Sequence, residues 1–296
     1  MKFITAQPCE PRFLWELEVL ITNIRKTCLD KHEIIAIFND QNPHLMRKFQ
    51  QKYGDQVTIK IYSDNRDNRA YSPTARPYLL WRFLSEDKAR ENDTYFQLDS
   101  DVIFREIPDI PELSSKKIIG SDCGGYIDYN YLITRKNGEQ IVEGFAKILN
   151  VTEELIRETP GIGAQWIFTS PTADLWWHIW RDSDNLYNFL QGIDSDIQKW
   201  TAEMWSQLYN FAKYGWEVEI SPELAFCMST DPVELWDSKK ILHNAGVVSR
   251  NASACFYKGD YISRSPFGDD MSWVRRDKCS RKYVDAIEKV SIENTK

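Results

Sequence analysis

Two aspartates separated by one residue, Asp99 and Asp101, are the feature of the sequence best suited to chemistry. They lie in TYFQLDSDVIF, with an apolar run on each side of Asp-Ser-Asp. In a strand over 94–104, alternate side chains point the same way, so the two carboxylates would share a face and Ser100 would point opposite. Two such carboxylates repel each other unless a cation lies close by. The pattern predicts a site for Mg²⁺ or Mn²⁺, completed by substrate phosphates.

The segment LDSDVIF resembles the Asp-x-Asp signature of the GT-A glycosyltransferases, especially the family-eight galactosyl- and glucosyltransferases. The resemblance implies that Asp99 contacts the donor ribose and the metal, and that Asp101 binds the metal. In those enzymes a late His-x-x-Gly motif completes the metal shell, and LHNAGV supplies His243 and Gly246 here. Mn²⁺ accepts one imidazole beside oxygen ligands. The alternative for His243 is a structural histidine after a short apolar run.

Two basic residues are candidates for binding the donor. Family-eight enzymes continue from the glycine to Lys-Pro-Trp, whereas this chain continues VVSRNASACFYKGDY, so Lys258 is a displaced candidate for the phosphate-binding lysine. Arg76, in SPTARPYLLWRFL, resembles the arginine that opens the helix before the Asp-x-Asp strand and reaches the donor phosphates and sugar. The alternative for Arg76 is a solvated helix start.

Two further acids are candidates for the donor and acceptor sides of the site. Asp64 ends the expected third strand, where GT-A enzymes often hold the base or ribose; the alternative is a turn residue. Glu203, in KWTAEMWSQLYNF, is the candidate base of an inverting transferase, which needs a carboxylate to deprotonate the acceptor hydroxyl; a retaining transferase can leave that proton to the departing phosphate. The alternative for Glu203 is a solvated helix face.

The segment GIGAQWIF reads either as an acceptor-side segment, in which Trp166 stacks on a sugar, or as a buried strand entered through a glycine turn.

The elements that must position these residues alternate along the first hundred residues, as expected for parallel strands joined by crossover helices. Expected strands cover 3–6, 33–38, 57–62 and 94–104, and expected helices cover 14–28, 43–53 and 74–87. Ligands in open α/β sheets bind beyond the carboxyl ends of the strands, so Asp40, Asp64, Asp99 and Asp101 are expected at one edge. The fold predicted is an α/β GT-A fold with a Rossmann-like, mostly parallel central sheet flanked by helices.

The predicted organisation is one GT-A domain over 1–296. Residues 1–110 would form the nucleotide-sugar-binding half, residues 111–275 the acceptor-binding half, and residues 277–296 a surface tail helix. The chain is 42% hydrophobic, which is enough apolar material for a sizeable core.

Composition also narrows the class of protein and its partners. The net charge of −7 gives no general attraction to nucleic acid. The six cysteines form no C-x-x-C pair, which argues against zinc-ribbon and thioredoxin-like sites. No stretch approaches the roughly 20 apolar residues of a membrane span. The apolar run near the first residue is too short for the core of a signal peptide. We therefore expect a cytoplasmic protein with reduced thiols.

The function predicted is transfer of a sugar from a nucleotide-diphosphate sugar to an acceptor hydroxyl, with Mn²⁺ or Mg²⁺ held by Asp99, Asp101 and His243. The metal would neutralise the diphosphate as the glycosidic bond breaks. UDP-sugar is favoured as the donor by the resemblance. The alternatives are a nucleotidyltransferase, a non-catalytic sugar-binding protein, or a dehalogenase-like phosphatase, although Ile103 stands where the last class has Thr or Val.

Overall fold

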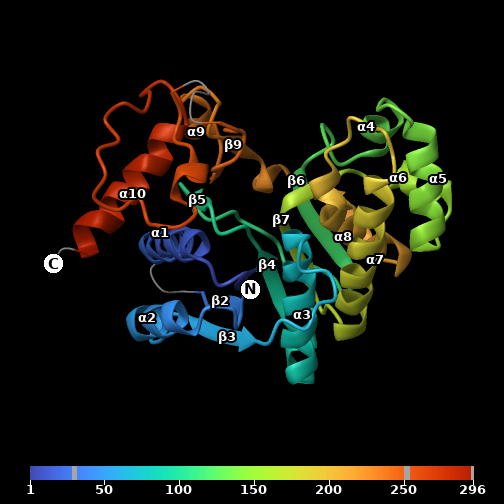
Figure 1. The fold of residues 1–296 in the computed structure, drawn as a ribbon, viewed down its shortest axis with the longest axis horizontal. Helices are drawn as coiled ribbons and strands as arrows, with labels where there is room; N and C mark the ends of the chain where they lie inside the picture. The colour runs from blue at the N-terminus through green and yellow to red at the C-terminus, as the bar shows by residue number, and fades with distance from the viewer. Residues whose placement is uncertain (29–31, 250–253, 295–296) are drawn as a thin grey trace.

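The computed structural model describes residues 1–28, 32–249 and 254–294. Its strands are β1 (Lys2–Gln7), β2 (Ile34–Asn39), β3 (Thr58–Tyr62), β4 (Thr94–Gln97), β5 (Val102–Phe104), β6 (Lys117–Asp122), β7 (Ile162–Thr169), β8 (Glu217–Ile220), β9 (Phe226–Met228) and β10 (Ile241–His243). Its α-helices are α1 (Pro11–Cys28), α2 (Pro43–Tyr53), α3 (Ala75–Glu86), α4 (Tyr129–Ile133), α5 (Gly138–Leu149), α6 (Glu153–Glu158), α7 (Ala173–Gln191), α8 (Ala202–Lys213), α9 (Leu235–Ser238) and α10 (Ser280–Asn294). Figure 1 shows their arrangement.

The central sheet has seven strands in the order β3-β2-β1-β4-β7-β6-β8. β1 pairs in parallel with β2 and β4, β2 with β3, and β6 with β8. β7 runs antiparallel to both of its neighbours, β4 and β6. The mostly parallel α/β sheet predicted from the sequence is therefore confirmed, with one reversed strand at its centre.

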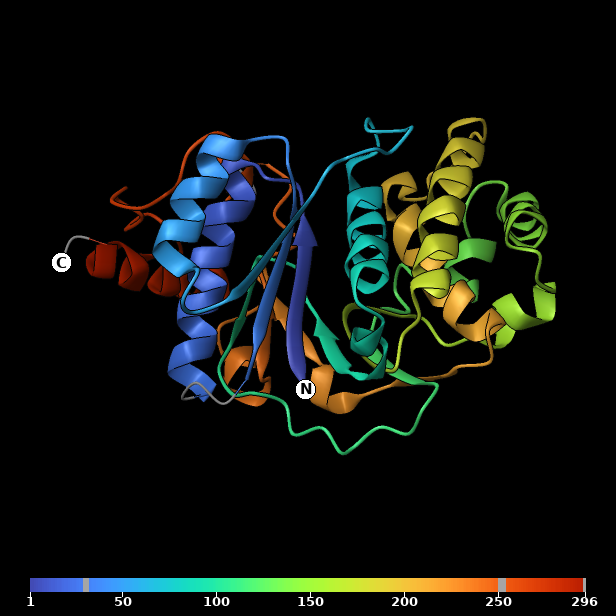
Figure 2. The same ribbon diagram turned by 90° about the horizontal axis from the view of Figure 1, so that it is seen from below.

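Helices cover both faces of this sheet, and β2 shows why. Ile34, Ala36 and Phe38 pack in one apolar cluster with residues of α1 and α2. Ile35 and Ile37 point to the other face, into a cluster with residues of α3, α7 and α8. A strand buried on both faces needs an unbroken apolar run, which EIIAIF supplies. Figure 2 shows α1 and α2 on one side of the sheet and α3 on the other.

A second, three-stranded sheet has the order β5-β10-β9. β10 runs antiparallel to β5 and places His243 opposite Val102. The C-terminal helix α10 lies against α1 (Figure 1), and its buried Tyr283, Val284 and Ile287 pack in a cluster with Trp15. This small sheet joins the end of the Asp-x-Asp segment to residues from the last quarter of the chain.

The single strand expected over 94–104 is wrong, because the chain forms two strands there that belong to different sheets. β4 ends at Gln97 in the central sheet, and β5 begins at Val102 in the small sheet. Both strands are buried, so their apolar runs look continuous in the sequence. Asp99 and Asp101 lie in the turn between the two strands, so their common direction does not come from strand alternation.

Candidate active site

Asp99, Asp101 and His243 form the centre of the candidate site. The Nε2 atom of His243 lies 3.4 Å from Oδ2 of Asp99 and 3.3 Å from Oδ1 of Asp101. One ligand atom from each residue lies within 4.8 Å of the other two. Asp101 and His243 are buried, while the side chain of Asp99 is 25% exposed. The three residues predicted as metal ligands therefore lie together, with Asp99 facing solvent.

Backbone contacts hold the two parts of this group in register. The N–H of Asn244 donates to the carbonyl oxygen of Asp101 at 2.9 Å, next to the pairing of His243 with Val102. Gly246 has a φ of +86°, and a Cβ there would lie 3.1 Å from the hydroxyl of Thr230. The glycine of His-x-x-Gly is thus required by the turn that follows the histidine.

Lys258 begins a short 3₁₀ helix and forms an ion pair with Oδ2 of Asp101. Burial of Asp101 favours its neutral form, but Lys258 and His243 outweigh burial and hold the pKa of this carboxyl well below its usual range. Burial of His243 favours the neutral imidazole, but the charge of Asp101 outweighs this and raises the pKa of His243. The aspartate is therefore ionised, as a metal ligand must be.

Arg76 lies in the first turn of α3 and connects the Asp-x-Asp turn to Glu203. Its guanidinium forms an ion pair with Oδ1 of Asp99 and lies 3.5 Å from Oε2 of Glu203. Burial raises the pKa of Glu203 to about 7, with the attraction of Arg76 opposing this rise. The second oxygen of Glu203, Oε1, has no hydrogen-bond partner among the described residues. Glu203 is therefore a buried carboxyl able to take up a proton near neutral pH.

The position of Glu203 is fixed by a tyrosine from the loop before α3. The hydroxyl of Tyr71 accepts a hydrogen bond from the N–H of Glu203 at 3.0 Å and donates one to the carbonyl of Trp200 at 2.5 Å. The solvated helix face considered for Glu203 is wrong, because this residue is only 3% exposed. The sequence did not reveal this burial. Acidic residues on helices usually face solvent, whereas α8 is buried on nearly all sides.

Asp64 belongs to a different network. Arg66 donates to both of its carboxylate oxygens, at 2.9 and 2.8 Å, and Asn39 donates to Oδ2 at 3.3 Å. The N–H of Asp64 in turn donates to Asp40 at 3.3 Å. β3 lies three places from β4 in the sheet, so Asp40 and Asp64 gather beside each other rather than at Asp99 and Asp101. A donor contact of Asp64 stays a prediction.

The acceptor-side interpretation of GIGAQWIF is wrong. β7 is a central strand, and both Gln165 and Trp166 are fully buried, so Trp166 has no open face for a sugar. Gly161 allows a close approach, but the partner is the backbone of Ile127, whose carbonyl oxygen would lie 1.7 Å from an added Cβ. The segment is the buried strand entered through a glycine.

Sequence reasoning missed a buried carboxylate behind the Asp-x-Asp turn. Glu16 of α1 is fully buried and accepts a hydrogen bond from the hydroxyl of Ser100 at 2.6 Å. Arg12, one helical turn earlier, donates to its other oxygen at 2.7 Å. The signal was present in the sequence: Arg12, Glu16 and Leu20 follow one another at a spacing of four, so the acid lies on the stripe that Leu20 buries.

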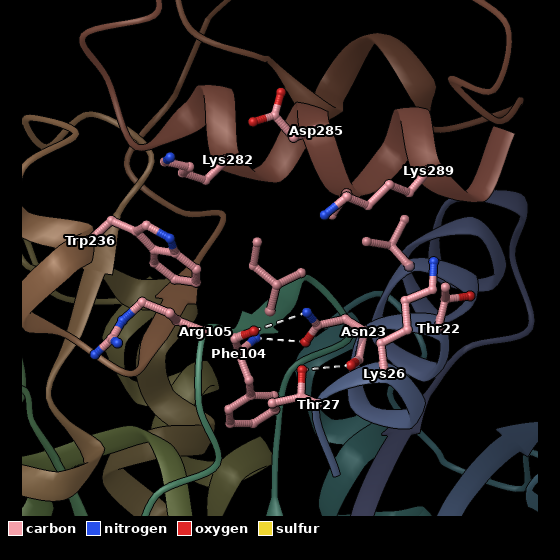
Figure 3. A pocket seen from close by; sticks show the side chains of 13 residues that line it. Thr22, Asn23, Lys26, Thr27, Phe104, Arg105, Trp236, Lys282, Asp285 and Lys289 are labelled. Carbon is pink, nitrogen blue, oxygen red and sulfur yellow. Dashed lines mark hydrogen bonds between the residues drawn. The ribbon is translucent and has the colours of Figure 1, made fainter. Parts of the chain in front are cut away.

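A separate cavity of about 580 Å³ lies between α1, β5 and α10. Figure 3 shows Asn23 of α1 and Lys289 of α10 at this cavity, with Trp236 at its side. The amide of Asn23 bonds both backbone groups of Phe104, at 3.0 and 2.6 Å, and so fixes β5 against α1. None of the predicted site residues lines this cavity.

No helix in the described ranges has the length and apolar character needed to span a bilayer. Among the cysteines whose side chains the structure describes, five are free and buried: Cys9, Cys123, Cys227, Cys255 and Cys279.

The sheet order and the Asp-x-Asp turn at the end of β4 define a GT-A-like fold, and comparison with solved structures confirms it. The chain matches the apo structure of the bifunctional glycosyltransferase WbbM with a TM-score of 0.52 at 10% identity, over 97% of this chain and 49% of that one. It matches the galactosyltransferase LgtC, in complex with donor and acceptor sugar analogs, with a TM-score of 0.52 at 12% identity, over 98% and 96%. An active-site mutant of LgtC gives 0.51 at 12% identity, with the same coverage.

These matches establish the fold and not the activity. The chain spans about half the length of the WbbM structure and nearly all of LgtC. No family model matches the chain. No curated protein sequence matches it either.

Proposed function

We propose that this protein is a metal-dependent glycosyltransferase that moves a sugar from a nucleotide-diphosphate sugar to an acceptor hydroxyl. The observation that carries the proposal is the group of Asp99, Asp101 and His243 at the end of β4, within a fold shared with glycosyltransferases. A GT-A-like fold alone would not specify the reaction, because one fold hosts several chemistries.

The donor set fits Mn²⁺ or Mg²⁺. Two carboxylates supply the oxygen ligands that hard cations prefer, and one imidazole is accepted by a borderline ion such as Mn²⁺. When bound, the ion would act as a Lewis acid that stabilises negative charge on the departing diphosphate. Asp99 is the more exposed of the two acids, so we propose that a donor reaches the ion beside it.

Lys258 and Arg76 flank the three ligands and are proposed to bind the donor phosphates. Each is paired with one of the carboxylates, Lys258 with Asp101 and Arg76 with Asp99. Charge-assisted hydrogen bonds from ammonium and guanidinium groups are strong and suit phosphate oxygens. The same two cations hold the acid pair together, because they offset the repulsion between the carboxylates. A UDP-sugar is the favoured donor on the resemblance of the two motifs, and Asp64 is retained as a predicted donor contact.

Glu203 is proposed as the base. Its oxygen Oε1 is buried and has no hydrogen-bond partner in the described part of the chain, and its pKa of about 7 would let it take the proton of an acceptor hydroxyl that reaches it. As that proton moves to Glu203, the acceptor oxygen forms the new bond to the anomeric carbon. The bond from this carbon to the diphosphate oxygen breaks, and the diphosphate departs with the electron pair.

Trp200 is the aromatic residue proposed to contact the acceptor. It lies three residues before Glu203, and it is 57% exposed, in contrast to the buried Trp166. An indole face packs well against the C–H face of a sugar ring. The hydrogen bond from Tyr71 to its carbonyl keeps the Trp200 backbone beside Glu203.

A cytoplasmic location is proposed on the free thiols of the five described cysteines, because reducing compartments keep cysteines in this state. The division of 1–296 into a donor half, an acceptor half and a tail helix is retained as part of the proposal. In this division, α10 is the tail helix, and its apolar side chains pack against α1.

Nucleotide binding tests the proposal. Thermal-shift measurements with UDP, GDP, ADP and CDP, each with and without Mn²⁺, should show stabilisation by one diphosphate, expected to be UDP, only when the metal is present. Asp101→Asn should abolish this stabilisation. Asp237→Asn is the matched control, because Asp237 is exposed in α9 and is not one of the three grouped residues. Nucleotide binding that is the same with and without Mn²⁺, and the same in Asp101→Asn as in the wild type, would overturn the proposal.

A further inference from the structure

The middle residue of Asp-Ser-Asp is bound to a buried helix side chain. Ser100 is 5% exposed, and its hydroxyl donates to Oε2 of Glu16 at 2.6 Å. Ser100 thus turns away from the metal-ligand group and faces α1. The turn that carries Asp99 and Asp101 is therefore attached to α1 at its central residue.

Both oxygens of Glu16 are engaged. Oε2 accepts from Ser100, and Oε1 accepts from Nε of Arg12 at 2.7 Å. The side chain of Glu16 has no exposed surface, whereas that of Arg12 is 27% exposed. Arg12 therefore anchors Glu16 from the outer side of the helix, and Glu16 in turn holds Ser100.

The same helix also holds the far side of the turn. Asn23, two turns beyond Glu16, pairs with both backbone groups of Phe104 in β5. α1 consequently fixes the Asp-x-Asp turn at Ser100 and the strand that follows it at Phe104. The carboxylates of Asp99 and Asp101 project from a segment with two attachments to one rigid element.

A buried carboxylate at this place is not explained by stability alone, because burying its charge lowers the free energy of unfolding. Its neighbours along α1, Trp15 and Leu17, are buried apolar residues. Glu16 also lies near the negative charge of Asp101 and near the hydroxyl of Tyr283, which has no partner among the described residues. Well-packed apolar residues often replace buried ion pairs without loss of stability. What an apolar residue could not provide is the acceptor for Ser100.

We propose that Glu16 is a positioning residue that acts through Ser100 to hold the Asp-x-Asp turn in the conformation that presents both carboxylates to one metal ion. This inference rests on the proposed function only in requiring that the site binds a divalent cation. The turn pays little conformational entropy when a metal binds, because its conformation is already fixed. Without the hydrogen bond, the carboxylates must be ordered at the expense of metal affinity.

A Mn²⁺ titration followed by electron paramagnetic resonance measures this directly, without turnover. Removing a hydrogen-bonded partner behind metal ligands typically weakens metal binding about 10- to 100-fold. Ser100→Ala and Glu16→Met should each raise the Kd of Mn²⁺ within this range. The double variant should bind no more weakly than the weaker single variant, because the two residues act through one bond. Glu18→Gln is the control, since Glu18 lies on the same helix and bonds Lys52 and Tyr53 instead.

The melting temperature of the metal-free protein separates positioning from a structural role. Ser100→Ala should leave it nearly unchanged while Mn²⁺ affinity falls, whereas Glu16→Met should lower it, because Arg12 and Ser100 lose their common acceptor. Should Glu16→Met fail to fold, Ser100→Ala decides, because it removes only one hydroxyl. Wild-type Mn²⁺ affinity in Ser100→Ala would overturn the inference. Failure of the wild-type protein itself to bind Mn²⁺ would instead overturn the proposed function, and this inference with it.

Discussion

His243 and Asp101 come from distant parts of the chain, yet Nε2 of the imidazole lies 3.3 Å from Oδ1 of the carboxylate. The antiparallel pairing of β10 with β5 produces this contact, because it sets His243 opposite Val102, the residue after Asp101. The small sheet thus brings His243 to the two aspartates that follow β4 of the central sheet.

Replacing His243 with Ala should raise the Mn²⁺ concentration needed for half-maximal activity about 10-fold or more, because one of three protein ligands is lost. UDP binding should weaken only when metal is present. Activity measured over a Mn²⁺ titration checks the first point, and calorimetry with and without Mn²⁺ checks the second. An unchanged Mn²⁺ requirement would make His243 a structural residue.

The pH dependence of the metal-free protein gives a second check on His243. Its pKa is raised in the fold, so its contribution to stability is present below the unfolded value of about 6.5 and is lost as pH rises through the higher folded value. His243→Ala should therefore destabilise the metal-free protein more at pH 5 than at pH 9. Chemical denaturation at the two pH values measures this difference, and an equal cost at both would contradict the ion pair.

Replacing Asp101 should abolish sugar transfer, and adding Asp99→Asn should make the enzyme no worse, since both changes remove one metal site. The structure buries Asp101 in an ion pair with Lys258, and removing one partner of a buried pair costs about 3–5 kcal/mol. Asp101→Asn is therefore the preferred variant. Turnover near the wild-type rate in the presence of a chelator would contradict the account.

Glu203→Gln should lower turnover about 10²- to 10⁴-fold, because an amide cannot accept the acceptor proton. Wild-type turnover should rise with pH through about 7, the pKa of Glu203. Because this pKa is raised above 4.5, the stability contributed by the neutral carboxyl is full below about pH 4.5 and is lost as pH rises through about 7. The variant should therefore gain stability relative to wild type between pH 5 and pH 8, by up to about 3 kcal/mol.

Unfolding curves of both proteins at the two pH values provide the measurement for Glu203. A stability difference that does not change with pH would show that Glu203 titrates normally. A variant with near wild-type turnover would remove it as the base, even if its pKa is raised.

The central sheet was predictable because its evidence is local. EIIAIF is apolar along its whole length and ends in Asn39 and Asp40, which is typical of a strand buried on both faces. The alternation of such strands with helices over the first hundred residues then favours parallel pairing. The reversal of β7 was not predictable in this way, because direction depends on which strand it pairs with.

The site was predictable only where a motif carried it. Asp99, Asp101 and His243 stood out by their motifs, but the change of sheet after Gln97 did not, because β5 finds its partner in β10, more than a hundred residues later. The spacing of Glu16 and Leu20 places the acid on the buried side of α1, but its partner Ser100 is 84 residues away and no local pattern connects the two. The sequence left both interpretations of Trp166 open, because residue type alone does not distinguish a buried aromatic side chain from an exposed one.

The turnover of a sugar nucleotide tests the central claim most directly. The protein is incubated with a panel of UDP-sugars and a mixed hydroxyl acceptor, with Mn²⁺ or with chelator, and the products are separated by chromatography. With Mn²⁺, the wild-type protein should release UDP together with a glycosylated acceptor, or with free sugar where water takes the place of the acceptor. No product should form with chelator, and none should form with Asp101→Asn. Release of pyrophosphate or inorganic phosphate would identify a nucleotidyltransferase or a phosphatase, and binding without any turnover would identify a sugar-binding protein; each of these results would contradict the claim.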